Sequence, residues 1–402
     1  MGVLFSGKRS DMMKVHYQFV TVGLQNSFRQ TVIDTLLRRV EDLGIDCNEI
    51  DVLDSTNYFE KHANNAPTVA LYFGGSSTSF PDQAILDDLI LGAAYVLPVV
   101  QTLDGFSCFV PAQLSGINGF KLGSDADIEP LVAAILEGFS LLRNSRRLFI
   151  SYKRSDSTGI AIQLYEELER AGFDVFLDTH SIRPGDPVQE ELMHRMADTD
   201  VVVLLNSPGF LESFWTTEEL AEASGMSIAI LQLNWPGIAS LDDSQLTIPI
   251  SLQEPDFSPK GSADRLATLN PNVIQNLISS VEGLRARALA ARQDNLTTEF
   301  KRVADKKSVP IELQPHKYFS LECGGRKKII IPTIGVPQAF TYNQSDTRVK
   351  KYIASSEYDV FLLYDHKNIR ELWLEHLSWL DTHLPVKSFK IVDAESWLTN
   401  NI

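Results

Sequence analysis

Cysteine is scarce in this sequence, and its scarcity excludes two classes of protein. The 402 residues contain only Cys47, Cys108 and Cys323, which are widely spaced and form no CxxC pair. Such cysteines can build neither a disulfide framework nor a cysteine-ligated zinc site. The histidines supply no ligand spacing either, so we expect no metal. A reducing, cytoplasmic location is favoured.

Positive charge and long apolar runs are also lacking. The chain carries 36 Lys and Arg against 52 Asp and Glu, which gives a net charge of −16. A nucleic-acid backbone would be repelled by that balance. No apolar run approaches the roughly 20 residues needed to span a bilayer, because even residues 85–100 contain Asp87 and Asp88. We therefore expect a protein that binds neither nucleic acid nor membrane.

Apolar strand runs alternate with amphipathic helices in three segments, a pattern typical of parallel α/β sheets. The sequence predicts an α/β sensor or assembly domain at 1–144, a second α/β domain at 145–290, and a helical linker with a partial α/β region at 291–402. In the first domain we expect strands at 17–22, 67–73 and 95–100 and helices at 28–43 and 127–142.

The second domain repeats this plan more regularly. We expect strands at 148–151, 173–177, 201–205, 228–231 and 247–250, and helices at 158–171, 188–196 and 215–224. A long helix at 271–305 leads out of the domain. The last part is shorter, with expected strands at 328–331, 358–364 and 389–392 and a helix at 369–380.

Two motifs in the second domain indicate a chemistry. The run FISYKR is a strand that ends in Ser151, Tyr152, Lys153 and Arg154, a hydroxyl, a ring and two cations suited to a phosphorylated, planar ligand. Further along, Trp215 and Glu219 stand i, i+4 on the expected helix, so that an aromatic surface and a carboxylate share one face. Taken singly, each residue has an ordinary interpretation as a packing residue, a surface charge or a turn.

Residues 145 to 290 resemble a TIR domain. The blocks FISYKR, FDVFLDT with SIRPGD, LLNSPGFLES and FWTTEEL occur in the order and spacing of that family. The resemblance implies a flavodoxin-like parallel sheet in the centre of the chain. The first domain resembles a degenerate copy of the same plan, with Asp88 at the approximate place of the family glutamate.

In the TIR domains that cleave NAD+, the glutamate of the W-x-x-x-E-L block is catalytic, and the matching residue is Glu219 rather than Glu218. The resemblance thus implies an NAD+ nucleosidase in which Glu219 stabilises an oxocarbenium-like transition state. NAD+ would be the substrate, and no cofactor is needed. Asp178 could hold a ribose hydroxyl or cap the following loop. The expected substrate-binding residues are Ser151, Tyr152, Lys153, Arg154, Asp178, Ser207 and Trp215.

The resemblance also implies activation by assembly into a homo-oligomer or filament. The loop expected to dock on a neighbouring copy contains His180, Arg183, Pro184, Gly185 and Asp186. A nucleotide signal or a protein would be the trigger, and the role would be cell suicide in antiphage defence.

Two alternatives stay open. The chain could be a non-catalytic scaffold that signals only by contacts between TIR domains. It could instead be a cyclase or base-exchange enzyme that makes a cyclic ADP-ribose-type messenger at the same site.

Overall fold

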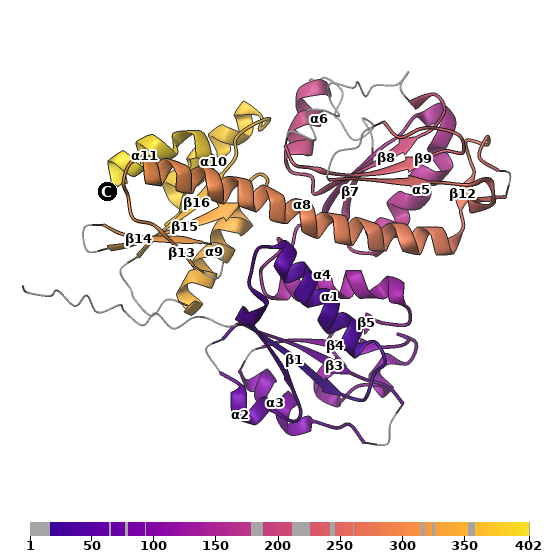
Figure 1. The fold of residues 1–402 in the computed structure, drawn as a ribbon, viewed down its shortest axis with the longest axis horizontal. Helices are drawn as coiled ribbons and strands as arrows, with labels where there is room; N and C mark the ends of the chain where they lie inside the picture. The colour runs from indigo at the N-terminus through magenta and orange to yellow at the C-terminus, as the bar shows by residue number, and fades with distance from the viewer. Residues whose placement is uncertain are drawn as a thin grey trace, which may run out of the picture. The chain divides into compact units, whose positions relative to one another are not determined.

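A computed structural model describes residues 17–63, 66–76, 79–92, 94–177, 188–210, 226–241, 246–259, 261–314, 318–323, 326–352 and 358–401. The chain divides into two compact units, one of residues 1–26 with 45–120 and the other of residues 27–44 with 121–402. Figure 1 shows the elements of each unit. The helix expected at 215–224 lies outside the described residues. The three-domain division predicted from the sequence stays a prediction.

The first unit is built on one sheet of order β2-β1-β3-β4-β5. Its strands are β1 (Tyr17–Gly23), β2 (Ile50–Asp54), β3 (Thr68–Phe73), β4 (Tyr95–Val100) and β5 (Phe120–Lys121). The pairs joining β2, β1, β3 and β4 are parallel. β1 and β3 are buried along almost their whole length, which explains why most of their residues are apolar. The three strands expected in this segment are confirmed.

The second unit contains a parallel sheet of order β10-β9-β8-β6-β7. The strands are β6 (Arg147–Ser151), β7 (Asp174–Leu177), β8 (Val201–Asn206), β9 (Ala229–Asn234) and β10 (Thr247–Ser251). Numbered along the chain from β6, the order is 2-1-3-4-5, which is the flavodoxin-like order. The fold class expected for the centre of the chain is therefore confirmed. Helices α5 (Arg154–Arg170) and α6 (Val188–Ala197) belong to this part.

Helix α5 begins with an irregular turn. Ser157 has φ −141° and ψ 24°, so the regular helix starts at Thr158, as the sequence predicted. Gly159 allows a close approach at this point, because a Cβ there would lie 2.4 Å from the carbonyl oxygen of Ala267. The Gly159 N–H donates to the carbonyl of Arg265 at 2.8 Å, and this bond fixes the loop against the helix.

Helix α8 (Pro271–Lys306) is 36 residues long and connects the parallel sheet to the last part of the chain (Figure 1). Pro271 opens it at a position where the missing N–H costs no helical hydrogen bond. Two helices from the amino-terminal part of the chain, α1 (Arg29–Asp42) and α4 (Ile128–Gly138), pack against it and each other. The expected helix at 271–305 is confirmed.

The last part folds as a five-stranded mixed sheet of order β13-β14-β15-β16-β17. Its strands are β13 (Glu312–Leu313), β14 (Phe319–Cys323), β15 (Arg326–Thr333), β16 (Tyr358–Tyr364) and β17 (Lys387–Lys390), and β15, β16 and β17 are parallel. Its helices are α9 (Ala339–Tyr352), α10 (Glu371–His383) and α11 (Ala394–Asn401). The strand expected at 389–392 was placed too late. β17 ends at Lys390 because its partner β16 ends at the paired Tyr364, and residues 391–393 form a 3-10 turn.

Candidate functional site

The carboxyl ends of β6 and β8 form the switch point of the parallel sheet, where the strand order reverses. The two strands are direct neighbours, with Ser151 paired to Leu204. Ligands of open α/β sheets bind outside such a point. Ser151 ends β6 and is buried, whereas Ser207 follows the end of β8. The ring of Tyr152 packs against the core under the sheet.

Asp156 joins the two strand ends. Its carboxylate accepts hydrogen bonds from Ser207 Oγ at 3.2 Å and from the Gly209 N–H at 3.1 Å. Ser155 Oγ donates to the second oxygen at 2.5 Å. Burial opposes ionisation of Asp156, but these three hydrogen bonds and the charge of Lys153 outweigh it and lower its pKa. Asp156 is therefore an ionised anchor for the loop after β8.

Gly209 permits Lys153 to lie over that loop. A Cβ at position 209 would lie 2.2 Å from Lys153 Nζ and 2.9 Å from Asp156 Oδ2, so only glycine fits without displacing both charges. The ammonium of Lys153 and the hydroxyl of Ser207 thus lie near each other, on either side of Asp156, at the carboxyl ends of β6 and β8. Groups of this kind can hold phosphate oxygens.

Sequence reasoning missed Asp156. An acidic residue in the first turn of a helix usually interacts with the helix N-terminus, so its type and position give no sign of a contact with residues 51 and 53 positions away. Ser207 and Lys153 both lie beside Asp156, and Arg154 lies on the surface at the start of α5. Asp178, Trp215 and Glu219 lie outside the described residues, as do His180, Arg183, Pro184, Gly185 and Asp186.

Replacing Asp156 by alanine is expected to destabilise the protein by about 1 kcal/mol, because three donors lose a charged acceptor that solvent replaces only in part. Urea unfolding of the purified chain measures the change. Asp156→Asn keeps one acceptor oxygen and should lose less. An alanine variant as stable as the parent would show that Asp156 does not anchor the loop after β8.

The first unit has an acidic residue at the place that resembles the family glutamate. Asp88 accepts a hydrogen bond from the hydroxyl of Tyr58 at 2.8 Å, and Tyr58 is almost completely buried. Burial and the contact with Asp88 both raise the pKa of the Tyr58 hydroxyl. This carboxylate is engaged in holding the core of the first unit.

A network of buried charges lies at the amino end of the parallel sheet β10-β9-β8-β6-β7, opposite the switch point. Asp200 is completely buried and accepts hydrogen bonds from Arg143 Nε at 2.7 Å and Arg285 Nε at 2.9 Å. Arg285, which is also completely buried, bonds Glu137 at 2.7 Å. The network joins the segment before β6, helix α4, helix α8 and the start of β8. Its charges therefore hold four separate parts of the chain together.

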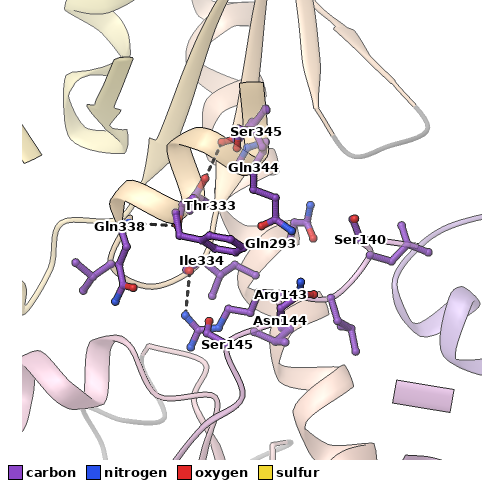
Figure 2. A pocket seen from close by; sticks show the side chains of 18 of the residues that line it. Ser140, Arg143, Asn144, Ser145, Gln293, Thr333, Ile334, Gln338, Gln344 and Ser345 are labelled. Atoms are coloured by element: carbon purple, nitrogen blue, oxygen red, sulfur yellow. Dashed lines mark hydrogen bonds between the residues drawn. The ribbon is translucent and has the colours of Figure 1, made fainter. Parts of the chain in front are cut away.

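The turn after β15 docks on the same network. Asp198 Oδ1 accepts from Arg143 Nη1 at 2.7 Å and from the Val336 N–H at 3.1 Å. Arg143 also donates to the carbonyl of Ile334 at 3.2 Å. Figure 2 shows Arg143 reaching Ile334 beside a cavity of about 180 Å³. Gly335 has φ +79°, and a Cβ there would lie 2.2 Å from Asp198 Oδ1, so the turn requires glycine.

His194 of α6 makes a second contact with the last part of the chain. Its ring stacks on Trp373 of α10 with a centroid separation of 5.3 Å, and its Nδ1 accepts a long hydrogen bond of 3.4 Å from the Arg370 N–H. The Arg370 side chain pairs with Glu191 at 2.7 Å. Burial lowers the pKa of His194 below 6.5, and the cations Arg370, Arg195 and Arg147 act with burial against the opposing charge of Glu191.

The sign of this shift predicts a loss of stability in mild acid. The unfolded chain binds a proton at His194 near pH 6.5, while the folded chain resists it, so folding weakens as the pH falls from 7.5 to 5.5. His194→Phe keeps the stacked ring and removes the titrating group. The drop in melting temperature between these pH values should be smaller in the variant. An equal drop in both proteins would exclude His194 as a source of the acid sensitivity.

Within the described ranges, no group of three or more His, Cys, Asp or Glu side chains is placed to hold a metal ion. None of the helices in these ranges has both the length and the apolar character needed to cross a membrane.

The parallel sheet and its switch point define a flavodoxin-like α/β domain, and comparison identifies its family. Residues 148–260 match the family model described as "TIR domain", and this segment is a TIR domain. Over 75 residues the chain is 35% identical to "Probable 2' cyclic ADP-D-ribose synthase BdTIR" of Brachypodium distachyon. This aligned segment makes up 18% of the present chain and 34% of that protein. Over 72 residues it is 29% identical to "2' cyclic ADP-D-ribose synthase BtTIR" of Bacteroides thetaiotaomicron. That aligned segment makes up 18% of the present chain and 25% of the relative.

The aligned segment thus spans between a quarter and about a third of these relatives. Among solved structures, the tagatose-6-phosphate ketose/aldose isomerase of Escherichia coli is 13% identical, with 70% of this chain and 82% of that chain covered. The TM-score of this match is 0.19.

Proposed function

We propose that the chain is an enzyme that cleaves the bond between nicotinamide and ribose in NAD+. The observation that carries the proposal is the TIR domain at 148–260 with Lys153, Asp156 and Ser207 gathered at its switch point. The names of the two relatives support a substrate of this class, because a cyclic ADP-ribose is made from NAD+ by loss of nicotinamide.

The described groups suit the diphosphate end of that substrate. Lys153 supplies a positive charge at the strand end, and Asp156 holds the following loop in place. The reaction then needs a carboxylate near the anomeric carbon, where positive charge develops as the nicotinamide leaves with the bonding electron pair. We assign this role to Glu219. Trp215 would stack on a ring, and Asp178 would bind a ribose hydroxyl.

Two products share this site. In hydrolysis, the oxygen of water bonds to the anomeric carbon and loses a proton, which gives linear ADP-ribose. In cyclisation, a ribose hydroxyl of the same molecule takes the place of water. Hydrolysis is our leading proposal, and the names of both relatives favour cyclisation as the second candidate.

We also propose that activity depends on assembly through the loop at 180–187, and that the enzyme serves in antiphage defence by depleting NAD+. A resting chain would then be nearly inactive, because an unregulated enzyme of this kind would be toxic. Assembly would raise the local concentration of TIR domains and complete the site.

The test is incubation of the purified full chain with NAD+ over a range of protein concentrations, with and without a crowding agent. Release of nicotinamide that rises more steeply than protein concentration is expected. Chromatography of the products distinguishes linear from cyclic ADP-ribose. Absence of nicotinamide release from chains that have assembled would favour a non-catalytic scaffold.

A further inference from the structure

A cavity of about 400 Å³ opens at the carboxyl ends of β15, β16 and β17, the three parallel strands of the last sheet. The segments that follow these strands line it, namely Thr333–Gly335, Asp365–Lys367 and Ile391–Val392. Small-molecule sites occupy about 300–1,000 Å³ and, in α/β sheets, lie at this end of the strands. Two further cavities in the described part of the chain, of about 180 and 240 Å³, fall below that range.

The cations in the wall of this cavity favour an anionic ligand. Arg292 of α8 donates to the carbonyls of Ala197 at 2.6 Å and Thr199 at 2.9 Å, so its hydrogen bonds bring it no carboxylate. Lys367 is exposed beside it. Of the two acidic residues in the wall, Glu299 pairs with Arg302 at 2.8 Å, outside the cavity. Asp365 accepts from the Lys367 N–H at 3.0 Å, and its charge partly offsets that of Arg292, which leaves Lys367, among the described residues, as the cation without a carboxylate hydrogen bond in this wall.

His366 adds a polar atom that lacks a partner. Its Nδ1 is buried and makes no hydrogen bond within the described residues. The nearest carboxylate oxygen, Asp365 Oδ1, lies 3.8 Å away, which is too far for a hydrogen bond. Buried polar atoms are nearly always satisfied, so a hydroxyl or amide of a ligand would complete this site.

Part of the remaining wall is apolar. Met226, Leu296 and Ile391 line the cavity together with Val392, whose side chain is 65% exposed. An apolar surface next to two cations and an unpartnered imidazole suits a ligand with a flat ring at one end, hydroxyls in the middle and a phosphate at the other. We propose that this cavity binds a nucleoside monophosphate.

The site joins the TIR domain to the last sheet. Met226 and Ala197 belong to the TIR segment, and Asn368 Nδ2 donates to the sulfur of Met226 at 3.1 Å. Asn295 of α8, which lines the cavity, donates to Ser227 Oγ of the TIR segment at 3.0 Å. A bound ligand touches both parts, so it stabilises their contact and raises the melting temperature of the chain.

Titration calorimetry of the full chain with adenosine, guanosine, cytidine and uridine monophosphates tests the proposal. We expect saturable binding of at least one of them, and weaker binding of the matching nucleoside and of inorganic phosphate alone. Lys367→Glu should weaken binding about tenfold or more, because a charge-assisted hydrogen bond is lost and replaced by repulsion. Lys301→Glu, on an exposed position of α8 outside the cavity, is the matched control and should bind normally.

A nucleotide could also bind at the switch point of the TIR domain, so Lys153→Ala is tested in parallel. Binding that survives Lys367→Glu and is lost in Lys153→Ala would overturn the proposal, as would the absence of saturable binding by all four nucleotides. Neither outcome depends on turnover of NAD+, so failure of this site and failure of the proposed function are distinguishable.

Discussion

Replacing Asp200 by alanine is expected to lower the free energy of unfolding by about 3–5 kcal/mol, the typical cost of removing one partner from a buried ion pair. The carboxylate is completely buried between Arg143 and Arg285. Arg285 is itself completely buried and would keep only Glu137 as a carboxylate partner. The buried positive charge of Arg285 would then be balanced by one carboxylate instead of two.

Urea unfolding measures this change. Two further variants serve as controls, one for an exposed ion pair and one for the removal of both buried charges. Glu166→Ala removes one member of an exposed pair with Arg170 and should leave the stability nearly unchanged, because solvent screens that pair. Asp200→Leu combined with Arg285→Leu removes both buried charges, and should lose much less than the sum of the single changes. Additive losses would show that the two charges act independently and that the network is not a unit.

The acidic and basic members of this network could not have been found from sequence. Arg285 and Asp200 are 85 positions apart, and Arg143 and Asp200 are 57 apart. An Asp before an apolar strand and an Arg on a long helix are ordinary surface residues in the absence of tertiary information. Only the packing of α8 across the amino end of the sheet brings them together.

The regular elements were predictable because one physical signal defines them. β8 is buried at every position, so its run of apolar residues leaves little choice of structure. β1 is buried at all but its last position and is mostly apolar, and the proline that opens α8 marks the start of that helix. The helices α9 and α11 were missed. Both mix polar and apolar residues without a clear helical period, and tertiary packing against the last sheet determines their structure.

Some residues of the candidate site could likewise be predicted from the sequence, and others could not. Lys153 and Ser207 could be proposed because each ends or follows a strand of one parallel sheet, and adjacent strand ends meet. Asp156 could not, because its partners depend on the irregular turn at Ser157 and on the close approach that Gly209 allows. Glu219, to which we assign the catalytic carboxylate, lies outside the described residues and stays a prediction from the motif.

Replacing Glu219 by glutamine is therefore the decisive experiment on function, and we expect it to reduce NAD+ cleavage by roughly 10²-fold or more. Glutamine keeps the volume and hydrogen-bonding length of the side chain but removes the negative charge. If that charge acts mainly on the transition state, kcat should fall while KM stays nearly constant. The melting temperature should be unchanged, which separates loss of chemistry from loss of folding.

Glu218→Gln is the matched control, because it makes the same change one position earlier. On a helix, neighbouring residues point about 100° apart, so the two carboxylates lie on opposite sides of Trp215 and cannot occupy the same position beside a ligand. We expect the Glu218 variant to cleave NAD+ at close to the parental rate. The reverse result would mean that the motif is aligned one residue off and that Glu218 is the catalytic carboxylate. Full activity in both variants would remove this block from the mechanism and assign the transition-state charge to another side chain.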